Sequence, residues 1–324
     1  MSKYIGRRVD LGIGRETTRG AGVAPTFWVP KVDFSFDDKV SVVRDVGSMG
    51  SIADSDDAFV TTKYGQGTIK GEVRDKSVGL LLYAMLGSLS TSGPTDSAYT
   101  HAFTLSETNQ HQSLAFTVVD PNTTELYKLC MLNSLELSVT LDNVVQFTAE
   151  FMGKRGVTSV ATASYSAENK FTKKHLAFKV AANLAGLAAA SALSLKSLAL
   201  TTNKNVATDD VLGTVEPEDF LNQQLSIEGQ IVLNYEDETW KGYMVNNTKR
   251  ALEIVLSNTD VLIGASTRPS LTLRMPYVDF HTWEPNYALN EIVTQTVSFK
   301  GNADISGGNK IISTCSLVNT QVSY

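Results

Sequence analysis

Apolar residues recur at every second position in short segments along the whole chain, and Gly, Asn, Asp and Ser separate these segments. This spacing is typical of β-strands with one buried and one solvated face. The pattern therefore predicts a mainly β protein. We expect strands over residues 32–36, 67–73, 113–119, 132–141, 144–151, 176–180, 195–201, 225–233, 271–275, 292–299 and 311–318.

Two stretches depart from this alternation and have apolar residues at helix-like spacing. They cover residues 76–86 (KSVGLLLYAML) and 238–256 (ETWKGYMVNNTKRALEIVL). Gly87 follows the first stretch at a position where a glycine commonly ends a helix. We therefore expect one flanking helix in each half of the chain.

The two halves of the sequence also resemble each other. Residues 68–73 (TIKGEV) match residues 226–231 (SIEGQI), and residues 147–153 (FTAEFMG) match residues 295–301 (QTVSFKG). In both halves the candidate helix lies between the two matching segments. Amphipathic strands also look alike by chance, but the shared order, glycine and helix favour a duplication.

Charge divides equally between the same two halves. Residues 1–160 hold 15 basic and 18 acidic side chains, and residues 161–324 hold 13 and 16, so each half has a net charge of −3. A segment rich in Ser, Thr and Ala at residues 157–167 is typical of a linker or surface loop. We therefore predict two tandem units, residues 1–160 and 161–324.

Overall composition narrows the classes of function. Hydrophobic residues make up 42% of the chain and charged residues 19%, which is enough apolar material for a sizeable core. The net charge of −6 argues against a protein whose main task is to grip nucleic acid by its phosphates. We expect no membrane-spanning helix, because no run of about 18 apolar residues occurs. The first residues (MSKYIGRRVDLGIGRE) lack the apolar core of a secretory signal.

Residue types that carry metal or redox chemistry are sparse and scattered. The only two cysteines, Cys130 and Cys315, are too few for a disulfide framework or a four-thiolate zinc site, and we expect both to be small core residues. No pair of the four histidines has metal-ligand spacing. We predict no metal site and no cofactor.

No constellation of residues indicates an enzyme. A glycoside hydrolase on a β-sandwich would need two carboxylates facing each other across a cleft, and the sequence marks no such pair. A surface adhesin would need an exposed aromatic patch, and the three tryptophans are far apart in sequence. Both remain less favoured alternatives to a structural protein. The acids considered are Glu72, Glu150, Glu228 and Glu253.

The predicted strands divide their side chains cleanly between two faces. In the first half Ile69 and Val73 point one way, whereas Lys70 and Glu72 point the other. The strands over residues 225–233, 144–151 and 292–299 have the same division. Each half therefore offers a sheet with one apolar and one charged face. Such a face is ordinarily solvated surface, and it would equally suit the wall of a water-filled channel.

Three segments of the chain resemble the phage tail tube protein family, the major tail proteins of long-tailed bacteriophages. They are residues 14–36 (GRETTRGAGVAPTFWVPKVDFSF), 68–88 (TIKGEVRDKSVGLLLYAMLGS) and 297–324 (VSFKGNADISGGNKIISTCSLVNTQVSY). The resemblance implies a β-sandwich/barrel fold of two sheets flanked by a helix. It also implies a structural virion protein, six of whose domains form a ring, with rings stacked into the hollow tail tube that conducts DNA during ejection.

Two such domains in one chain would let three chains complete a pseudo-hexameric ring. We prefer this arrangement because it agrees with the duplication predicted from the two matching halves. The alternatives are a hexamer of one elaborated domain, or another tube or connector protein of an injection machine. Open sheet edges would pair between neighbouring copies, which removes an aggregation hazard as the ring closes.

The resemblance implies that the charged faces of the sheets line the lumen of the tube. The residues expected to face the lumen are Glu72, Glu150, Glu228 and Gln230, together with Lys70 and Lys300, which share the same alternation. An acidic or neutral wall lets DNA pass, because a basic wall would bind its phosphates.

Residues 45–57 (DVGSMGSIADSDD) form a loop too long for an ordinary hairpin, and long loops are usually functional. We expect this loop to reach an adjacent ring, as an N-terminal arm at residues 1–26 and the C-terminal tail could also do. The loop residues singled out are Asp45, Ser48, Met49, Asp54, Asp56 and Asp57.

The expected partners follow from the same resemblance. They are other copies of the chain, the tail terminator, tape measure and distal tail proteins, and double-stranded DNA in transient, non-specific passage. The expected location is the tail tube of the virion, assembled in the host cytoplasm without membrane insertion.

Overall fold

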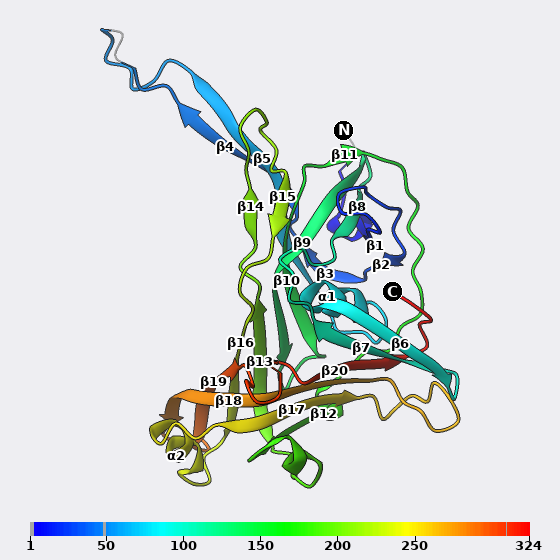
Figure 1. Cartoon of the computed structure of the whole chain (residues 1–324), viewed down its shortest axis with the longest axis vertical. Coiled ribbons are helices and arrows are strands. Elements are labelled where there is room, and N and C mark those ends of the chain that lie inside the picture. The colour runs from blue at the N-terminus through cyan, green and yellow to red at the C-terminus, as the bar shows by residue number, and fades with distance from the viewer. Residues whose placement is uncertain (1–2, 48–49, 309) are drawn as a thin grey trace.

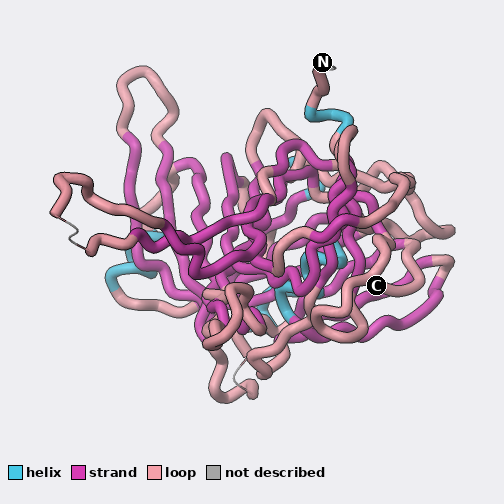
Figure 2. Tube along the Cα trace, turned by 90° about the horizontal axis from the view of Figure 1, so that it is seen from above, coloured by secondary structure: helices cyan, strands magenta, loops and turns pink. Residues whose placement is uncertain are grey.

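The structure, a computed structural model, describes residues 3–47, 50–308 and 310–324. Across these residues the chain is built almost wholly of antiparallel β-strands, with two short α-helices (Figures 1 and 2). The prediction of a mainly β protein is confirmed. All but two of the strands belong to one continuous, bent sheet.

The main sheet consists of six strands that run along the long axis of the molecule, each antiparallel to the next (Figure 1). Its strand order mixes the two halves of the chain, because β9 of the first half pairs directly with β13 of the second. In spatial order its strands are β5 (Ala58–Glu72), β10 (Gln146–Gly153), β9 (Thr124–Val139), β13 (Leu195–Asn203), β16 (Ser226–Asn234) and β19 (Thr294–Asn302).

A second group of strands, the cross sheet, runs across the main sheet (Figure 1). The long strand β18 joins the two, because its residues 277–286 pair with β19 and its residues 270–274 pair with β20. In spatial order the strands of the cross sheet are β12 (Leu176–Ala181), β17 (Arg250–Ser257), β18 (Ser270–Asn286), β20 (Thr314–Asn319), β7 (Ala98–Leu105) and β6 (Gly87–Thr95).

The remaining strands extend the edges of this framework. Strands β3 (Lys31–Phe34) and β4 (Asp37–Arg44) follow one edge of β5. Strand β8 (Leu114–Val119) pairs with β9 on one side and with β1 (Asp10–Arg15) on the other, and β1 in turn pairs with β2 (Phe27–Trp28). Strand β11 (Val157–Thr158) pairs with the start of β9. A separate hairpin is made by β14 (Ala207–Asp209) and β15 (Asp219–Leu221).

Helix α1 (Val78–Leu86) lies within the core, and all nine of its residues are buried. Its sequence is apolar on every side, as expected for a helix that contacts protein all around. The helix ends where the sequence predicts, because Gly87 adopts the left-handed conformation with φ 83°.

The second predicted helix is only partly correct. Helix α2 covers Thr239–Val245, whereas Arg250–Ser257 forms strand β17. The physical reason is that β17 pairs on both sides, with β12 and β18, and its apolar run is buried on both faces. A short run of this kind does not distinguish a buried strand from a buried helix.

One hydrophobic core draws side chains from both halves of the chain. A second cross-half pairing joins β7 to β20. The two halves therefore share sheet and core, and the division into units 1–160 and 161–324 stays a prediction.

Within the segment expected to form an N-terminal arm, residues 10–15 form β1 between β2 and β8 and bury Leu11 and Ile13, and the arm itself stays a prediction. The C-terminal tail also packs on its own chain. Tyr324 donates a hydrogen bond from Oη to the carbonyl of Lys76 (2.7 Å), and its ring lies so close to Gly79 that a Cβ there would be 2.1 Å from it.

Candidate functional site

The main sheet presents one continuous polar face, on the side opposite the core. Buried residues such as Ile69, Ile227 and Val297 alternate with the residues of this face, which confirms the predicted division of the strands. Strand pairing aligns the polar residues in rows across both halves of the chain. We call this set of rows the polar face.

Three rows define the polar face. The first row is Asp33, Lys70, Thr148, Glu136, Thr201, Glu228, Lys300 and Asp279. The second row is Glu72, Gln146, Ser138, Ala199, Gln230, Ser298 and Thr282. The third row is Thr68, Glu150, Ser134, Asn203 and Ser226.

All six residues predicted to share a function lie on this one face, although they come from opposite halves of the chain. Glu228 and Lys300 are direct cross-strand partners, and the Lys300 Nζ lies 2.8 Å from a Glu228 carboxylate oxygen. The hydrogen bond from Lys300 lowers the pKa of Glu228 and keeps it charged. At the opposite end of the same row, Lys70 lies 4.0 Å from Asp33.

Glu150 is held by neutral groups only. Its carboxylate accepts hydrogen bonds from Gln66 Nε2 and Asn133 Nδ2, both at 3.1 Å, and from Ser134 Oγ at 3.4 Å. None of these donors is charged, and among the described residues no cation forms an ion pair with the Glu150 carboxylate.

Glu72 has the opposite environment. It lies 2.9 Å from the Arg74 guanidinium and 2.7 Å from the Lys170 Nζ. Burial acts to raise the pKa of Glu72, but the hydrogen bonds from Lys170 and Arg74 outweigh it, so the pKa is lowered. Gln230, in the same row, is exposed between Ala199 and Ser298.

The polar face carries an excess of negative charge. Its three rows hold six carboxylates, whereas Lys70 and Lys300 are the only cations in those rows. The acids Glu136 and Asp279, which the sequence did not single out, belong to the first row. Alternation alone could have placed Glu136 on a polar face, but only the pairing of β9 with β13 brings it beside the residues of the second half.

A long hairpin projects from one end of the molecule (Figures 1 and 2). Strand β4 and residues 58–66 of β5 form it, and the hydrogen bond from the Asp45 amide to the Asp57 carbonyl (2.9 Å) closes its last rung. Asp54 and Asp56 lie on the exposed tip with these two acids. Ser48 and Met49, two of the predicted loop residues, lie outside the described residues.

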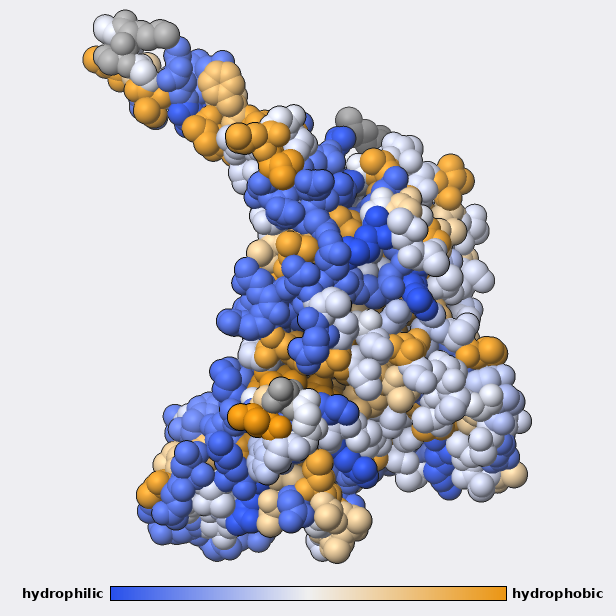
Figure 3. All heavy atoms as spheres, viewed as in Figure 1, coloured by the Kyte–Doolittle hydropathy of each residue, from blue (hydrophilic) through white to orange (hydrophobic). Residues whose placement is uncertain are grey.

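The hairpin carries exposed apolar side chains that the sequence analysis missed. Val42 pairs with Val60, and Val43 pairs with Phe59, so the two pairs occupy opposite faces of the hairpin. Val43 is 56% exposed and Phe59 is 55% exposed. Figure 3 shows hydrophobic residues spread along this projection. The signal that could have revealed them is the pair of short apolar runs, KVSVV and AFV, on either side of the loop.

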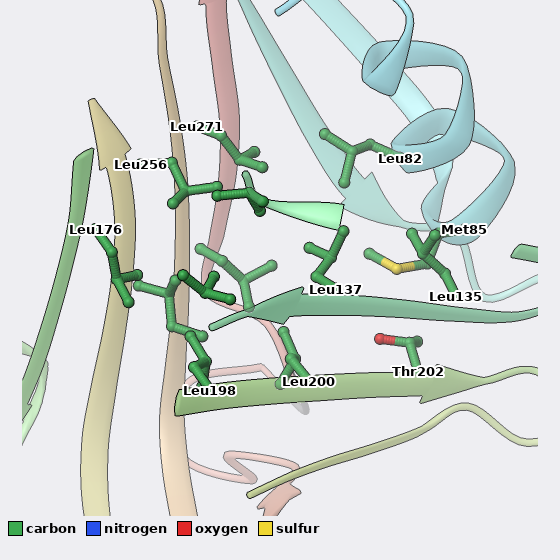
Figure 4. A pocket seen from close by; sticks show the side chains of 14 residues that line it. Leu82, Met85, Leu135, Leu137, Leu176, Leu198, Leu200, Thr202, Leu256 and Leu271 are labelled. Carbon is green, nitrogen blue, oxygen red and sulfur yellow. The ribbon is translucent and has the colours of Figure 1, made fainter. Parts of the chain in front are cut away.

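Between the main sheet and the cross sheet lies a small apolar cavity of about 30 Å³ (Figure 4). Leu135 and Leu137 from β9, Leu198 and Leu200 from β13, and Leu82 from α1 surround it. A cavity with such an apolar lining stays dry. It is a gap in packing between two sheets, and Thr202 is the one polar residue among its described lining residues, which is too little to orient a substrate.

No helix in the described part of the chain is long and apolar enough to cross a membrane. Among residues 3–47, 50–308 and 310–324, no group of three His, Cys, Asp or Glu side chains is placed to hold a metal ion. Cys130 and Cys315 are both buried core residues, as predicted.

A model of the phage tail tube protein family matches residues 6–317, which is nearly the whole chain. The chain belongs to this family. It is therefore a structural protein of the phage virion, located in the tail tube, and the predicted resemblance is confirmed. A comparison with curated proteins finds no match.

Proposed function

We propose that this tail tube protein polymerises into stacked rings, whose shared lumen conducts double-stranded DNA during ejection. Three chains per ring is the preferred arrangement, with six as the alternative. The observation that carries the proposal is the single acid-rich polar face, which crosses all six strands of the main sheet and both halves of the chain. A solvated face of this width fits the wall of an aqueous channel.

The two ends of the main sheet offer the contacts that would close a ring. At one end, β3 and β4 present an edge that pairs only with β5 among the described residues. At the other end, residues 279–286 of β18 pair only with β19 within the same part of the chain. Open edges of this kind join other strands readily. Because the two edges differ, their pairing is head-to-tail, which generates a ring when the rotation from one copy to the next closes.

The charge of the polar face suits a wall along which DNA slides. Carboxylates repel phosphates, whereas a basic lining would bind them and release counterions. The cross-strand pair Glu228–Lys300 limits the repulsion among the acids and leaves the wall with a moderate negative excess.

The hairpin of β4 and β5 supports contact between rings. Exposed apolar pairs on both of its faces would be buried only if the hairpin lies between two other surfaces. The adjacent ring provides these surfaces in the proposed tube. The tail terminator, tape measure and distal tail proteins would contact the ends and the lumen of the same assembly.

Electron cryo-microscopy of the purified protein tests the proposal, combined with native mass spectrometry of single rings. We expect rings or tubes with a central channel, three chains per ring, and Glu228 and Glu150 facing that channel. Rings with six chains would replace the preferred arrangement with its alternative. Particles that remain monomeric at high concentration and after addition of preformed tail tubes would contradict the proposal. Rings with these two acids on their outer surface would contradict the assignment of the lumen.

A further inference from the structure

A groove of about 730 Å³ lies beside the polar face, between the N-terminal segment, β3 and the end of β5. Four cations and two acids line it. The charged lining residues are Arg7, Asp10, Lys31, Glu72, Arg74 and Lys170. We call it the basic groove.

The acids of the basic groove are already engaged within the chain. Glu72 pairs with both Arg74 and Lys170. Asp10 accepts a hydrogen bond from the Tyr165 hydroxyl at 2.6 Å.

Two cations of the basic groove remain without an acidic partner. Arg7 and Lys31 form no ion pair with any described residue, and the Lys31 Nζ donates only to the Gly6 carbonyl at 3.3 Å. Both residues line the groove, where Arg7 is exposed and Lys31 is half-buried. The groove therefore has a local positive excess in a chain whose net charge is −6.

The hairpin tip has the complementary charge. Asp45, Asp54, Asp56 and Asp57 are all exposed there. In the described part of the chain they form no ion pairs, and Asp45 and Asp57 accept hydrogen bonds only from amides of the hairpin itself. The hairpin stands away from the rest of the molecule in Figure 1, and these charges have no oppositely charged partner among the described residues of their own chain.

We propose that the acidic hairpin tip of one copy docks in the basic groove of a copy in the adjacent ring. This inference rests on the proposed function and assigns the surface that receives the hairpin. The eight-residue strand β4 alone is ~26 Å long at about 3.3 Å per residue. The hairpin therefore projects far enough from the body of its own subunit to contact a neighbouring copy (Figure 1). Opposite charges would set the register and speed of stacking more than its final strength.

Charge reversal tests this pairing. The tip variant carries Asp54→Lys, Asp56→Lys and Asp57→Lys, and the groove variant carries Arg7→Glu and Lys31→Glu. We expect each variant alone to form single rings that stack at least tenfold less than wild type at low salt, because like charges then meet. An equal mixture of the two variants should stack again, since every contact in alternating rings is once more between opposite charges. The chain that combines all five substitutions should stack for the same reason.

A control chain with Asp142→Lys and Lys249→Glu reverses exposed charges outside both surfaces and should stack like wild type. Negative-stain microscopy and sedimentation measure ring and stack populations across a salt series. If both reversed variants stack normally while wild type forms tubes, the inference fails and the proposed function stands. If the wild type forms no rings, the proposed function fails first. If the groove variant instead stacks normally and loses binding to a DNA duplex, the groove is a nucleic-acid surface and the inference is overturned.

Discussion

The ring of Phe299 lies directly over Gly229, its cross-strand partner in the main sheet. A Cβ on Gly229 would lie 2.2 Å from the ring. The first half contains the same arrangement, in which Phe147 lies over Gly71 and a Cβ would approach to 2.7 Å. In both halves an aromatic ring therefore covers the backbone of the glycine that is shared by the matching segments TIKGEV and SIEGQI.

We expect Gly229→Ala to destabilise the protein by about 1–3 kcal/mol, because the new methyl group must displace a fully packed ring. Urea unfolding of the purified chain measures the change. Gly242→Ala is the matched control, since no described atom beyond its chain neighbours and the backbone of its own helix, α2, lies within 4 Å of its Cβ position. This control should gain about 0.5–1 kcal/mol from helix propensity. Equal effects of the two substitutions would contradict the role of Phe299.

The glycine–phenylalanine pairs also show what the sequence repeat could and could not predict. The matching segments FTAEFMG and QTVSFKG align Phe299 with Phe151, but the structure pairs the glycine of the first half with Phe147. The closing strands of the two halves are therefore displaced by four residues relative to their sequence match. Pairing register depends on contacts between distant segments, which a comparison of segments does not contain.

The same limit applies to the candidate site. Alternation correctly predicts which side chains of one strand share a face, as Ile69 and Lys70 show. It cannot predict that β9 pairs with β13 and so joins the polar surfaces of the two halves. Local pattern also misassigned Arg250–Ser257, because burial on both sides of a strand removes the alternation that identifies it.

Lys204 offers a test at alkaline pH. Its side chain is almost fully buried, and Nζ donates to the carbonyl of Ala84, near the end of helix α1 (2.8 Å). Burial, with a smaller contribution from Arg19, lowers the pKa of Lys204 from 10.5 to about 7. Between these two values the unfolded chain binds more protons than the folded chain, so the free energy of unfolding should rise with pH across this window.

Lys204→Met should remove this rise in the free energy of unfolding with pH. It should also lower the free energy of unfolding by an amount that does not depend on pH, because the Ala84 carbonyl loses its hydrogen-bond donor. The measurement is urea unfolding of both chains between pH 6 and 10. We expect the wild type to gain stability relative to the variant as pH increases above about 7. A difference in the free energy of unfolding that stays constant from pH 6 to pH 10 would contradict a lowered pKa for the buried Lys204.

Asp96 offers a test at acidic pH. Its carboxylate accepts hydrogen bonds from the amides of Ala265, Ser266 and Thr267, and from the Thr267 hydroxyl, at 2.7–3.1 Å. The amides of Ser266 and Ala265 make the largest contributions in lowering the pKa of Asp96 from 3.8 to about 2. Because the folded pKa lies below the unfolded value, this stabilisation is complete above pH 4 and is lost as pH falls towards 2.

The Asp96→Asn variant should therefore be less stable than wild type at pH 5, and the difference in stability between the two should nearly vanish at pH 2. Thermal unfolding across this range measures the difference. Asp142→Asn, at an exposed turn, is the control and should show no such convergence. A wild-type advantage that persists unchanged at pH 2 would mean that the carboxylate charge is not what holds the loop at residues 265–267.

If the polar face lines the channel, as proposed, the sign of its charge should decide whether assembled tubes bind or release DNA. Replacing Glu228 and Gln230 with lysine changes the charge of each chain by three units on adjacent rows of the face. Tubes of this variant should retain a DNA duplex that wild-type tubes release, and the retention should fall steeply as salt is raised, because it depends on counterion release. Co-sedimentation of tubes with labelled DNA measures the retained fraction.

The matched control is the swap Glu228→Lys with Lys300→Glu. This swap preserves both the cross-strand ion pair and the net charge, so its tubes should release DNA as wild-type tubes do. If the lysine variant forms tubes that bind no more DNA than the swap does, the polar face does not line the channel.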